Sequence, residues 1–314
     1  MEQRHSVPQL SFLNSQLSLS EFLQQLLNGL SLGAIYALIA LGYTMVYGVL
    51  RFINFAHSDV FMVGAFIGYY LGKLVPENTV WGGLIVLLAA MLGCAVLGIV
   101  IERLAYRPLR SAATLNVLIT AIGVSLLLEY SGQVFFGATP RTFPAVFPSV
   151  NFTLGGLVIS SNQVVVIVVT ALLMVGLQLI VYRTKIGTAM RAVSLNPKAA
   201  QLVGVNNDIV ISFTFGLGSA LAAAGGILYA LNYPSIDPLM GVMPGLKAFV
   251  AAVLGGIGNI PGAALGGLLL GTVETFVNGS QWSTYKDAIA FAILIIILLF
   301  RPAGLLGRAT IEKV

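Results

Sequence analysis

Long apolar segments separated by short polar ones run through nearly the whole chain, and this alternation decides what the chain can fold into. A segment of about 20 apolar residues crosses a bilayer as a helix, because lipid offers no hydrogen-bond partner to an unpaired backbone. Of the 314 residues, 58% are hydrophobic and 9% are charged, whereas a soluble domain carries about a quarter charged residues. The sequence therefore predicts an all-α polytopic membrane protein with about eight transmembrane segments. These segments span residues 22–48, 59–75, 80–101, 114–136, 162–182, 209–231, 245–277 and 285–300.

We expect a single transmembrane domain over residues 22–307, between a leader of residues 1–21 and a cytoplasmic tail of residues 308–314. The leader lacks the succession of basic, apolar and small residues that marks a cleaved signal peptide. We therefore expect the first span to be retained. Cys94 is the only cysteine and lies in an apolar segment, which leaves no disulfide framework.

The basic residues indicate the orientation in the membrane, because loops rich in lysine and arginine stay in the cytoplasm. Eleven of the 16 lysine and arginine residues lie in four segments, which we place inside. The N-terminus is then outside and the C-terminus inside, and the net charge of +5 reflects topology and anionic lipid before nucleic acid. The four segments are 51–58, 102–113, 183–208 and 301–314.

Two of the apolar segments are interrupted. The seventh, at about 33 residues, is too long for one straight crossing, and a glycine- and proline-rich run over 255–262 breaks it. We interpret this segment as two half-helices that meet inside the membrane. A polar run over 51–59 precedes the short second segment. Each half of the chain thus holds a glycine-rich helix followed by a broken segment, in opposite orientations, which predicts an inverted repeat.

Paired broken segments mark the substrate path of many transporters. Unwound backbone at membrane depth occurs only beside protein or a water-filled cavity, and ionisable side chains at that depth usually face such a cavity. The alternatives are a purely structural glycine hinge, a hydrogen-bonded structural histidine and a carboxylate at the interface with water. The predicted pathway residues are Asn54, His57, Asp59, Gly255, Gly256, Gly258, Asn259 and Glu274.

The polar segment 183–208 predicts a surface that couples this chain to a cytoplasmic partner. Asn196-Pro197 is a good helix start, since asparagine caps and proline suits the first turn, and Gly204 is a good stop. A short cytoplasmic helix with an apolar tip suits a groove on a soluble protein, whereas the alternative is a helix lying on lipid head groups. The predicted coupling residues are Arg191, Asn196, Pro197, Lys198, Ala199, Ala200, Leu202 and Gly204.

The sequence contains no motif that would make the chain an enzyme. It has no phosphate-binding loop, and two histidines with one cysteine cannot form a metal-ligand cluster of the usual kind. No nucleophile and base occur in a recognisable arrangement. We therefore expect no ATP hydrolysis, no metal and no cofactor on this chain, and we expect the energy for transport to come from another subunit.

Four stretches of this sequence resemble the branched-chain amino acid ABC-importer permease family, and in particular its LivH-type subunit. They are Asn28 to Gly48, Ile53 to Val60, the 183–206 loop and Ala252 to Gly262. The resemblance covers about residues 22 to 307. Lys198 stands where many importers have an acidic residue, so the resemblance implies docking of this loop without any particular ion pair. Ser58 stands where the family usually has glycine.

The resemblance implies a second permease subunit, two cytoplasmic ATP-binding subunits, an external substrate-binding protein and no cofactor. The function expected from it is import of branched-chain or other neutral amino acids into the cytoplasm by alternating access, across the bacterial inner membrane. The alternatives are a permease of a urea or short-chain amide ABC importer and an ion-coupled secondary transporter. No charged relay supports the last of these, and a membrane-embedded enzyme lacks a catalytic constellation.

Overall fold

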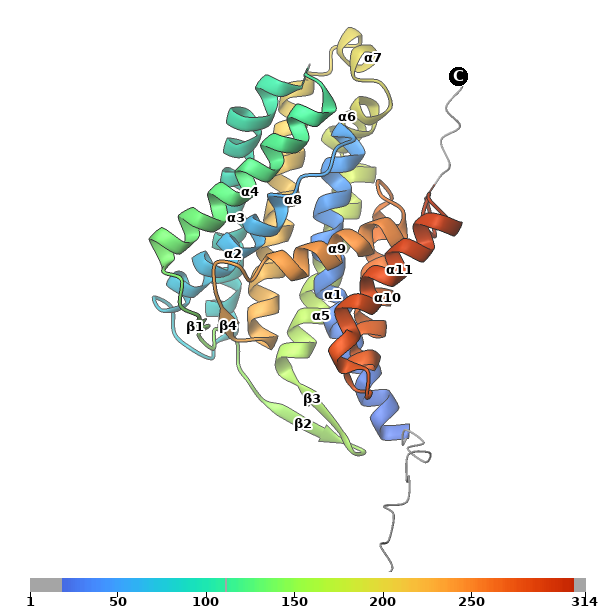
Figure 1. Ribbon diagram of the computed structural model, residues 1–314. Coiled ribbons are helices and arrows are strands. Elements are labelled where there is room, and N and C mark those ends of the chain that lie inside the picture. Colours follow the sequence, from blue (N-terminus) through green and yellow to red (C-terminus); the bar gives the residue numbers. More distant parts are fainter. Residues whose placement is uncertain (1–18, 111, 308–314) are drawn as a thin grey trace, which may run out of the picture.

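The computed structural model describes residues 19–110 and 112–307 of the chain (Figure 1). The predicted leader lies almost entirely, and the predicted tail wholly, outside these residues. Within the described part, seven helices are long and apolar enough to cross a membrane, α3 and α11 being counted with the short turns that adjoin them. The prediction of an all-α polytopic protein is confirmed. The seven are α1 (Leu19–Leu50), α3 (Val80–Ile101), α4 (Thr114–Phe136), α5 (Ser161–Arg183), α8 (Asn207–Asn232), α10 (Ile260–Asn278) and α11 (Lys286–Phe300).

Shorter elements complete the fold. The helices α2 (His57–Gly72) and α9 (Val242–Gly255) lie within the bundle, and a π-helical turn (Glu102–Tyr106) followed by a 3-10 turn (Arg107–Leu109) extends α3. A further 3-10 turn, Ser283–Tyr285, precedes α11. The remaining elements are α6 (Lys185–Leu195), α7 (Pro197–Leu202), β1 (Arg141–Thr142), β2 (Asn151–Leu154), β3 (Leu157–Ser160) and β4 (Ser235–Ile236).

The bundle has two distinct ends. One end carries α6 and α7, and we call it the inner end because the basic segments lie there; the other carries the strands, and we call it the outer end (Figure 1). At the outer end β2 and β3 form an antiparallel hairpin, and β1 pairs with β4. Gly155 and Gly156 both have positive φ, as a two-residue hairpin turn requires. The first helix begins at the outer end.

The packing of the helices agrees with the predicted inverted repeat. The helix α1 runs from the outer to the inner end, whereas α8 runs back from α7 to β4 (Figure 1). The helix α1 packs along α10, and in the same way α8 packs along α3. Similarly α2 packs on α8 and on α3, while α9 packs on α1 and on α10. The units α1–α4 and α8–α11 therefore have matching contacts in opposite orientations.

Small residues allow the central helices to approach closely. A Cβ placed on Gly33 of α1 would lie 2.7 Å from the Cα of Leu268 on α10, a distance at which the backbone must shift. Since lipid supplies no hydrophobic force between helices, such close van der Waals packing is a main source of their association. The central helices α1 and α8 are largely buried, whereas α4, α5 and α11 are mostly exposed on the outside of the bundle.

The seventh apolar segment differs from the two half-helices that we predicted. The helix α9 has 14 residues, too few to cross the bilayer, but α10 has 19 and is long enough to cross it alone. The turn between them lies near the inner end of α1, where a Cβ on Gly258 would be 4.0 Å from the Cα of Gly48. The break itself falls within residues 255–262, as predicted, but the two helices are unequal, and only α10 is long enough to cross the bilayer.

Candidate functional site

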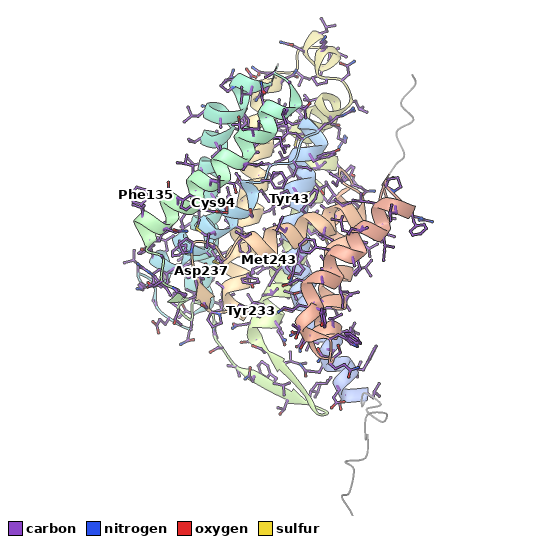
Figure 2. The ribbon with its side chains drawn as sticks, in the orientation of Figure 1. Tyr43, Cys94, Phe135, Tyr233, Asp237 and Met243 are labelled. Atoms are coloured by element: carbon purple, nitrogen blue, oxygen red, sulfur yellow. The ribbon has the colours of Figure 1, made fainter. Side chains whose placement is uncertain are left out.

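A polar cavity of about 840 Å³ lies towards the outer end of the bundle. Its walls come from α1, α5, α8, α9, α10 and the start of α11, together with the segment that joins α8 to α9. Figure 2 labels Tyr233 and Met243, which both line it. The volume lies in the range of small-molecule binding sites. Further lining residues are Gln25, Asn28, Ser31, Leu32, Tyr36, Asn162, Gln163, Tyr229, Leu231, Asn232, Lys247, Glu274 and Asp287.

Charged side chains from different helices meet in the wall of this cavity. The Nζ of Lys247 on α9 lies 2.5 Å from Glu274 Oε1 on α10 and 2.6 Å from Asp287 Oδ1 at the start of α11. The Tyr36 hydroxyl on α1 donates to Glu274 Oε2 at 2.9 Å. The side chains of Lys247 and Glu274 are only 6% and 7% exposed. Buried charges at membrane depth are costly unless they are paired, and they usually mark a functional path.

The opposite wall of the cavity is polar without being charged. Asn232 donates to Ser31 Oγ at 3.0 Å, and Gln163 donates to Asn28 Oδ1 at 2.7 Å. Asn162 donates to the carbonyl of Leu231 at 3.1 Å, while its own Oδ1 is buried and has no hydrogen-bond partner among the described residues. This wall is therefore held together by hydrogen bonds among neutral side chains, in contrast to the charged wall.

Of the predicted pathway residues, Glu274 lines this outer cavity, but Asn54, which precedes α2, and His57 and Asp59 in its first turn do not. Asn54 accepts a hydrogen bond from Tyr106 at 2.6 Å, and Asp59 accepts one from Ser125 at 2.5 Å. The ring of His57 packs against Tyr43, with the centroids 4.7 Å apart. All three predicted residues are buried. The structure thus places them among the central helices, apart from Glu274.

The other predicted pathway residues form the turn between α9 and α10. Gly256 and Gly258 have positive φ, which glycine adopts without strain. Asn259 caps α10 by accepting from the backbone of Gly262, and it also donates to the carbonyl of Leu306. The carbonyl of Gly255 accepts from Leu306. Several polar groups of this turn are therefore bonded to the segment that follows α11.

The segment 183–208 forms two helices at the inner end. Asn196 caps α7 through the backbone of Ala199, and Pro197 occupies the first turn, as predicted. Gly204 ends the turn with positive φ. Ala200 is buried, but Leu202 is 88% exposed, and Leu195 and Val203 are also exposed. We call the exposed residues Leu195, Leu202 and Val203 the inner apolar surface.

The remaining coupling residues occupy different positions around these helices. Lys198 and Ala199 are exposed on α7. Arg191 on α6 is directed back into the bundle, where it donates to the carbonyl of Val181 and lies over the ring of Tyr182. Arg191 is therefore positioned to support α6, whereas Lys198 is available to a partner.

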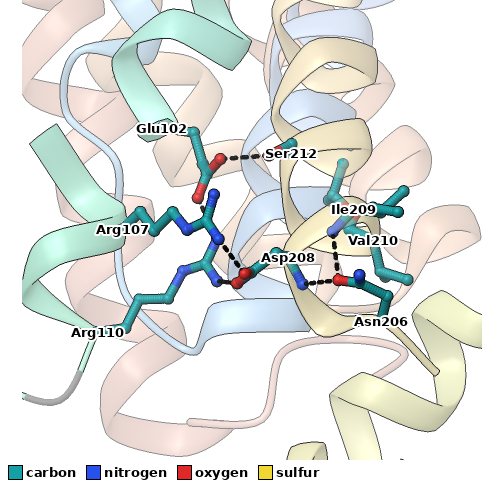
Figure 3. Close-up of polar contacts among 9 residues, drawn as sticks. Glu102, Arg107, Arg110, Asn206, Asp208, Ile209, Val210 and Ser212 are labelled. Atoms are coloured by element: carbon teal, nitrogen blue, oxygen red, sulfur yellow. Dashed lines mark hydrogen bonds and ion pairs between the residues drawn. The ribbon is translucent and has the colours of Figure 1, made fainter. Parts of the chain in front are cut away.

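A charged cluster at the inner end joins α3 to α8 (Figure 3). Glu102, in the π-helical turn, is fully buried; it accepts from Ser212 Oγ at 2.5 Å and pairs with Arg110. Arg110 also pairs with Asp208 at 2.6 Å, and Arg107 contacts the same carboxylate. The cluster lies beside a second cavity of about 810 Å³ that Arg110 and Asp208 line together with residues of α7.

Sequence reasoning missed Lys247 and the cluster around Glu102. A signal for each was available, because Lys247 is the only charged residue in the apolar helix α9, and Glu102 directly follows an apolar span. Charges in such positions are functional candidates. Within the described residues no group of three or more histidine, cysteine, aspartate or glutamate side chains is arranged to hold a metal ion.

Comparison with known proteins identifies the family. Residues 25–298 match the family described as the permease component of branched-chain amino acid transport systems. The chain is 45% identical over 302 residues to the high-affinity branched-chain amino acid transport system permease protein BraD of Pseudomonas aeruginosa, a match that covers 93% of this chain and 98% of BraD. It is 42% identical over 304 residues to the permease protein LivH of the same kind of system in Escherichia coli, with the same coverage of both chains.

No solved structure matches the chain. The family match nevertheless extends over all the helices that form the two cavities and the inner apolar surface. The chain belongs to the family of permease components of branched-chain amino acid transport systems.

Proposed function

We propose that this chain is a transmembrane permease subunit of an ATP-driven ABC importer that moves branched-chain amino acids into the cytoplasm. The observation that carries the proposal is the family membership over nearly the whole chain, together with a polar cavity towards the outer end. The permease relatives transport branched-chain amino acids according to their names. The chain would act in the bacterial inner membrane as a multi-pass protein without a cofactor of its own.

The proposal includes three kinds of partner protein. A second permease subunit would complete the path, two ATP-binding subunits would supply energy at the inner end, and an external binding protein would deliver substrate at the outer end. The inner apolar surface supports the second of these, because exposed leucine and valine side chains on short cytoplasmic helices are suited to a groove on a soluble protein. ATP-driven movement of the ATP-binding subunits would open the substrate path alternately to the outside and to the cytoplasm.

Uptake of labelled leucine into proteoliposomes tests this function. The complete transporter is expected to accumulate leucine only when ATP and the binding protein are both present on their correct sides. Omitting this chain, with all other subunits present, is expected to abolish the uptake. Leucine accumulation by this chain alone in an ion gradient would contradict the proposal and favour a secondary transporter. Competition by urea but not by valine would favour the amide importer.

A further inference from the structure

The outer cavity presents opposite charges side by side on two different helices. Lys247 of α9 reaches both Glu274 and Asp287, and Glu274 is further held by the hydroxyl of Tyr36. Lys247 and Glu274 are almost wholly buried yet both line the cavity. A solute in the cavity therefore has a cation and a carboxylate within its reach at once.

We propose that Lys247 and Glu274 bind the carboxylate and the ammonium group of a zwitterionic amino acid in this cavity, an assignment that rests on the proposed function. The amino acid carboxylate would take the place of a protein carboxylate on Lys247. Its ammonium group would then bind the carboxylates of Glu274 and Asp287 that Lys247 has partly released.

Charge balance favours a zwitterion over other small solutes. A zwitterion adds no net charge to a poorly solvated site, and it supplies a partner for each protein charge that it displaces. An amine carries only the positive group and a carboxylic acid only the negative one. Either would leave a buried protein charge unpaired, which is costly. Urea has no charge with which to replace the ion pair. The cluster thus distinguishes amino acids from the amides that a related importer would carry.

The cavity also offers a place for an apolar side chain. Leu32, Leu231 and Met243 line it from α1, α8 and α9, beside the ring of Tyr229. In a ligand site the convergent polar groups fix the orientation of the ligand, and the apolar residues contact its apolar part. An amino acid bound through its backbone charges would direct its side chain towards these walls.

Tyr36 is a positioning residue in this site. Its hydroxyl donates to one oxygen of Glu274, and Lys247 contacts the other oxygen. The carboxylate of Glu274 is therefore fixed from two sides, so that loss of the Tyr36 hydroxyl would loosen the group that receives the ammonium.

The competing account is that Lys247 and Glu274 form only a structural ion pair. Replacing both residues with apolar ones distinguishes a structural ion pair from a site that binds amino acid charges. A buried ion pair replaced by well-packed apolar residues of similar volume is often as stable as the original. A purely structural pair should therefore tolerate Lys247→Met combined with Glu274→Met, whereas a site that binds amino acid charges should not.

The experiment uses the complete transporter with its binding protein in proteoliposomes. Leucine uptake is measured per ATP hydrolysed by the assembled complex, which separates substrate passage from the motion of the ATP-binding subunits. We expect the double variant to lower this ratio at least about tenfold, the effect of losing one charge-assisted hydrogen bond. Lys73→Met, an exposed change at the outer end of α2, is the matched control and should retain the ratio.

A second pair of variants covers the case in which the double variant does not assemble. Tyr36→Phe removes a single oxygen and should lower the ratio about threefold to tenfold. Tyr130→Phe, on the exposed face of α4, should not change it. The proposal would be overturned if the double variant had the same uptake per ATP as wild type. If the double variant fails to assemble, a wild-type ratio in Tyr36→Phe would overturn it instead. A wild-type complex that imports no leucine would instead refute the proposed function.

Discussion

At the scale of the residue, close packing of glycines is the most specific feature of the central helices. Gly33 approaches the backbone of α10 so closely that any Cβ would collide with Leu268. A Cβ built on Gly176 of α5 would instead have no atom within 4 Å. The two glycines look alike in sequence, and only their tertiary surroundings separate a packing requirement from a tolerated residue.

We predict that Gly33→Ala lowers the free energy of unfolding by about 1–3 kcal/mol, the usual cost of forcing extra volume into a packed interior. Gly176→Ala should not lower it and should raise it by about 0.5–1 kcal/mol, because alanine favours the helix more than glycine does and its Cβ meets nothing there. Thermal unfolding of the purified complexes measures both. Equal stability of the two variants would show that α1 and α10 are not packed as closely as described.

Glu102 differs from its neighbours in the inner charged cluster because it is fully buried, whereas the side chain of Asp208 is 43% exposed. We predict that Glu102→Gln destabilises the chain by about 3–5 kcal/mol, since it leaves Arg110 with a weakened partner inside the protein. Asp208→Asn should cost about 1 kcal/mol or less, because solvent screens that pair. The same unfolding measurement compares them, and a larger loss for Asp208→Asn would contradict this ranking.

At the scale of the element, the long continuous spans were predictable, because bilayer thickness fixes their length, whereas the short helices α2 and α9 are not among the helices long enough to cross. The helix start at Asn196-Pro197 was also predictable, since its signal is local. The helix α6 was missed, although Thr184 accepts from the backbone of Gly187 as an N-cap does, and so was the β2–β3 hairpin, although Gly155-Gly156 marks its turn.

The meeting of side chains from distant elements was not predictable from one sequence. Tyr36 and Glu274 are 238 positions apart, and Lys247 is 27 positions from Glu274. No periodicity within a helix relates such residues. The same reason explains why the pathway residues near α2 and those at the α9–α10 turn were grouped with Glu274, from which the fold separates them.

The inner apolar surface gives a prediction for the helix α7. Leu202→Asp should weaken co-purification of the ATP-binding subunits about thirtyfold, the effect of removing one strong contact at an interface. Membrane abundance should stay near wild type, because the side chain of Leu202 is 88% exposed and takes no part in the core of the chain. Ala200→Asp should instead reduce abundance, since Ala200 is buried. Normal recovery of the ATP-binding subunits with Leu202→Asp would exclude this surface from docking.

At the scale of the whole molecule, the two similar halves provide a mechanism for alternating access. In an inverted repeat, movement of one unit against the other opens one end of a central path as it closes the opposite end. The present structure has a cavity towards each end, one lined by Met243 and Lys247 and the other by residues of α7 and α8. The central claim is that the outer cavity receives the substrate and closes when the ATP-binding subunits bind ATP.

Cysteine accessibility at Met243 tests this claim most directly. In a Cys94→Ala background, Met243→Cys should react with a membrane-impermeant maleimide added outside to the nucleotide-free complex. ATP with hydrolysis-deficient partner subunits should lower the labelling at least about fivefold, as the population shifts away from the open state. Lys185→Cys, exposed at the inner end, should react only from inside. Labelling of Met243→Cys from the inside alone, or labelling that ATP leaves unchanged, would contradict the account.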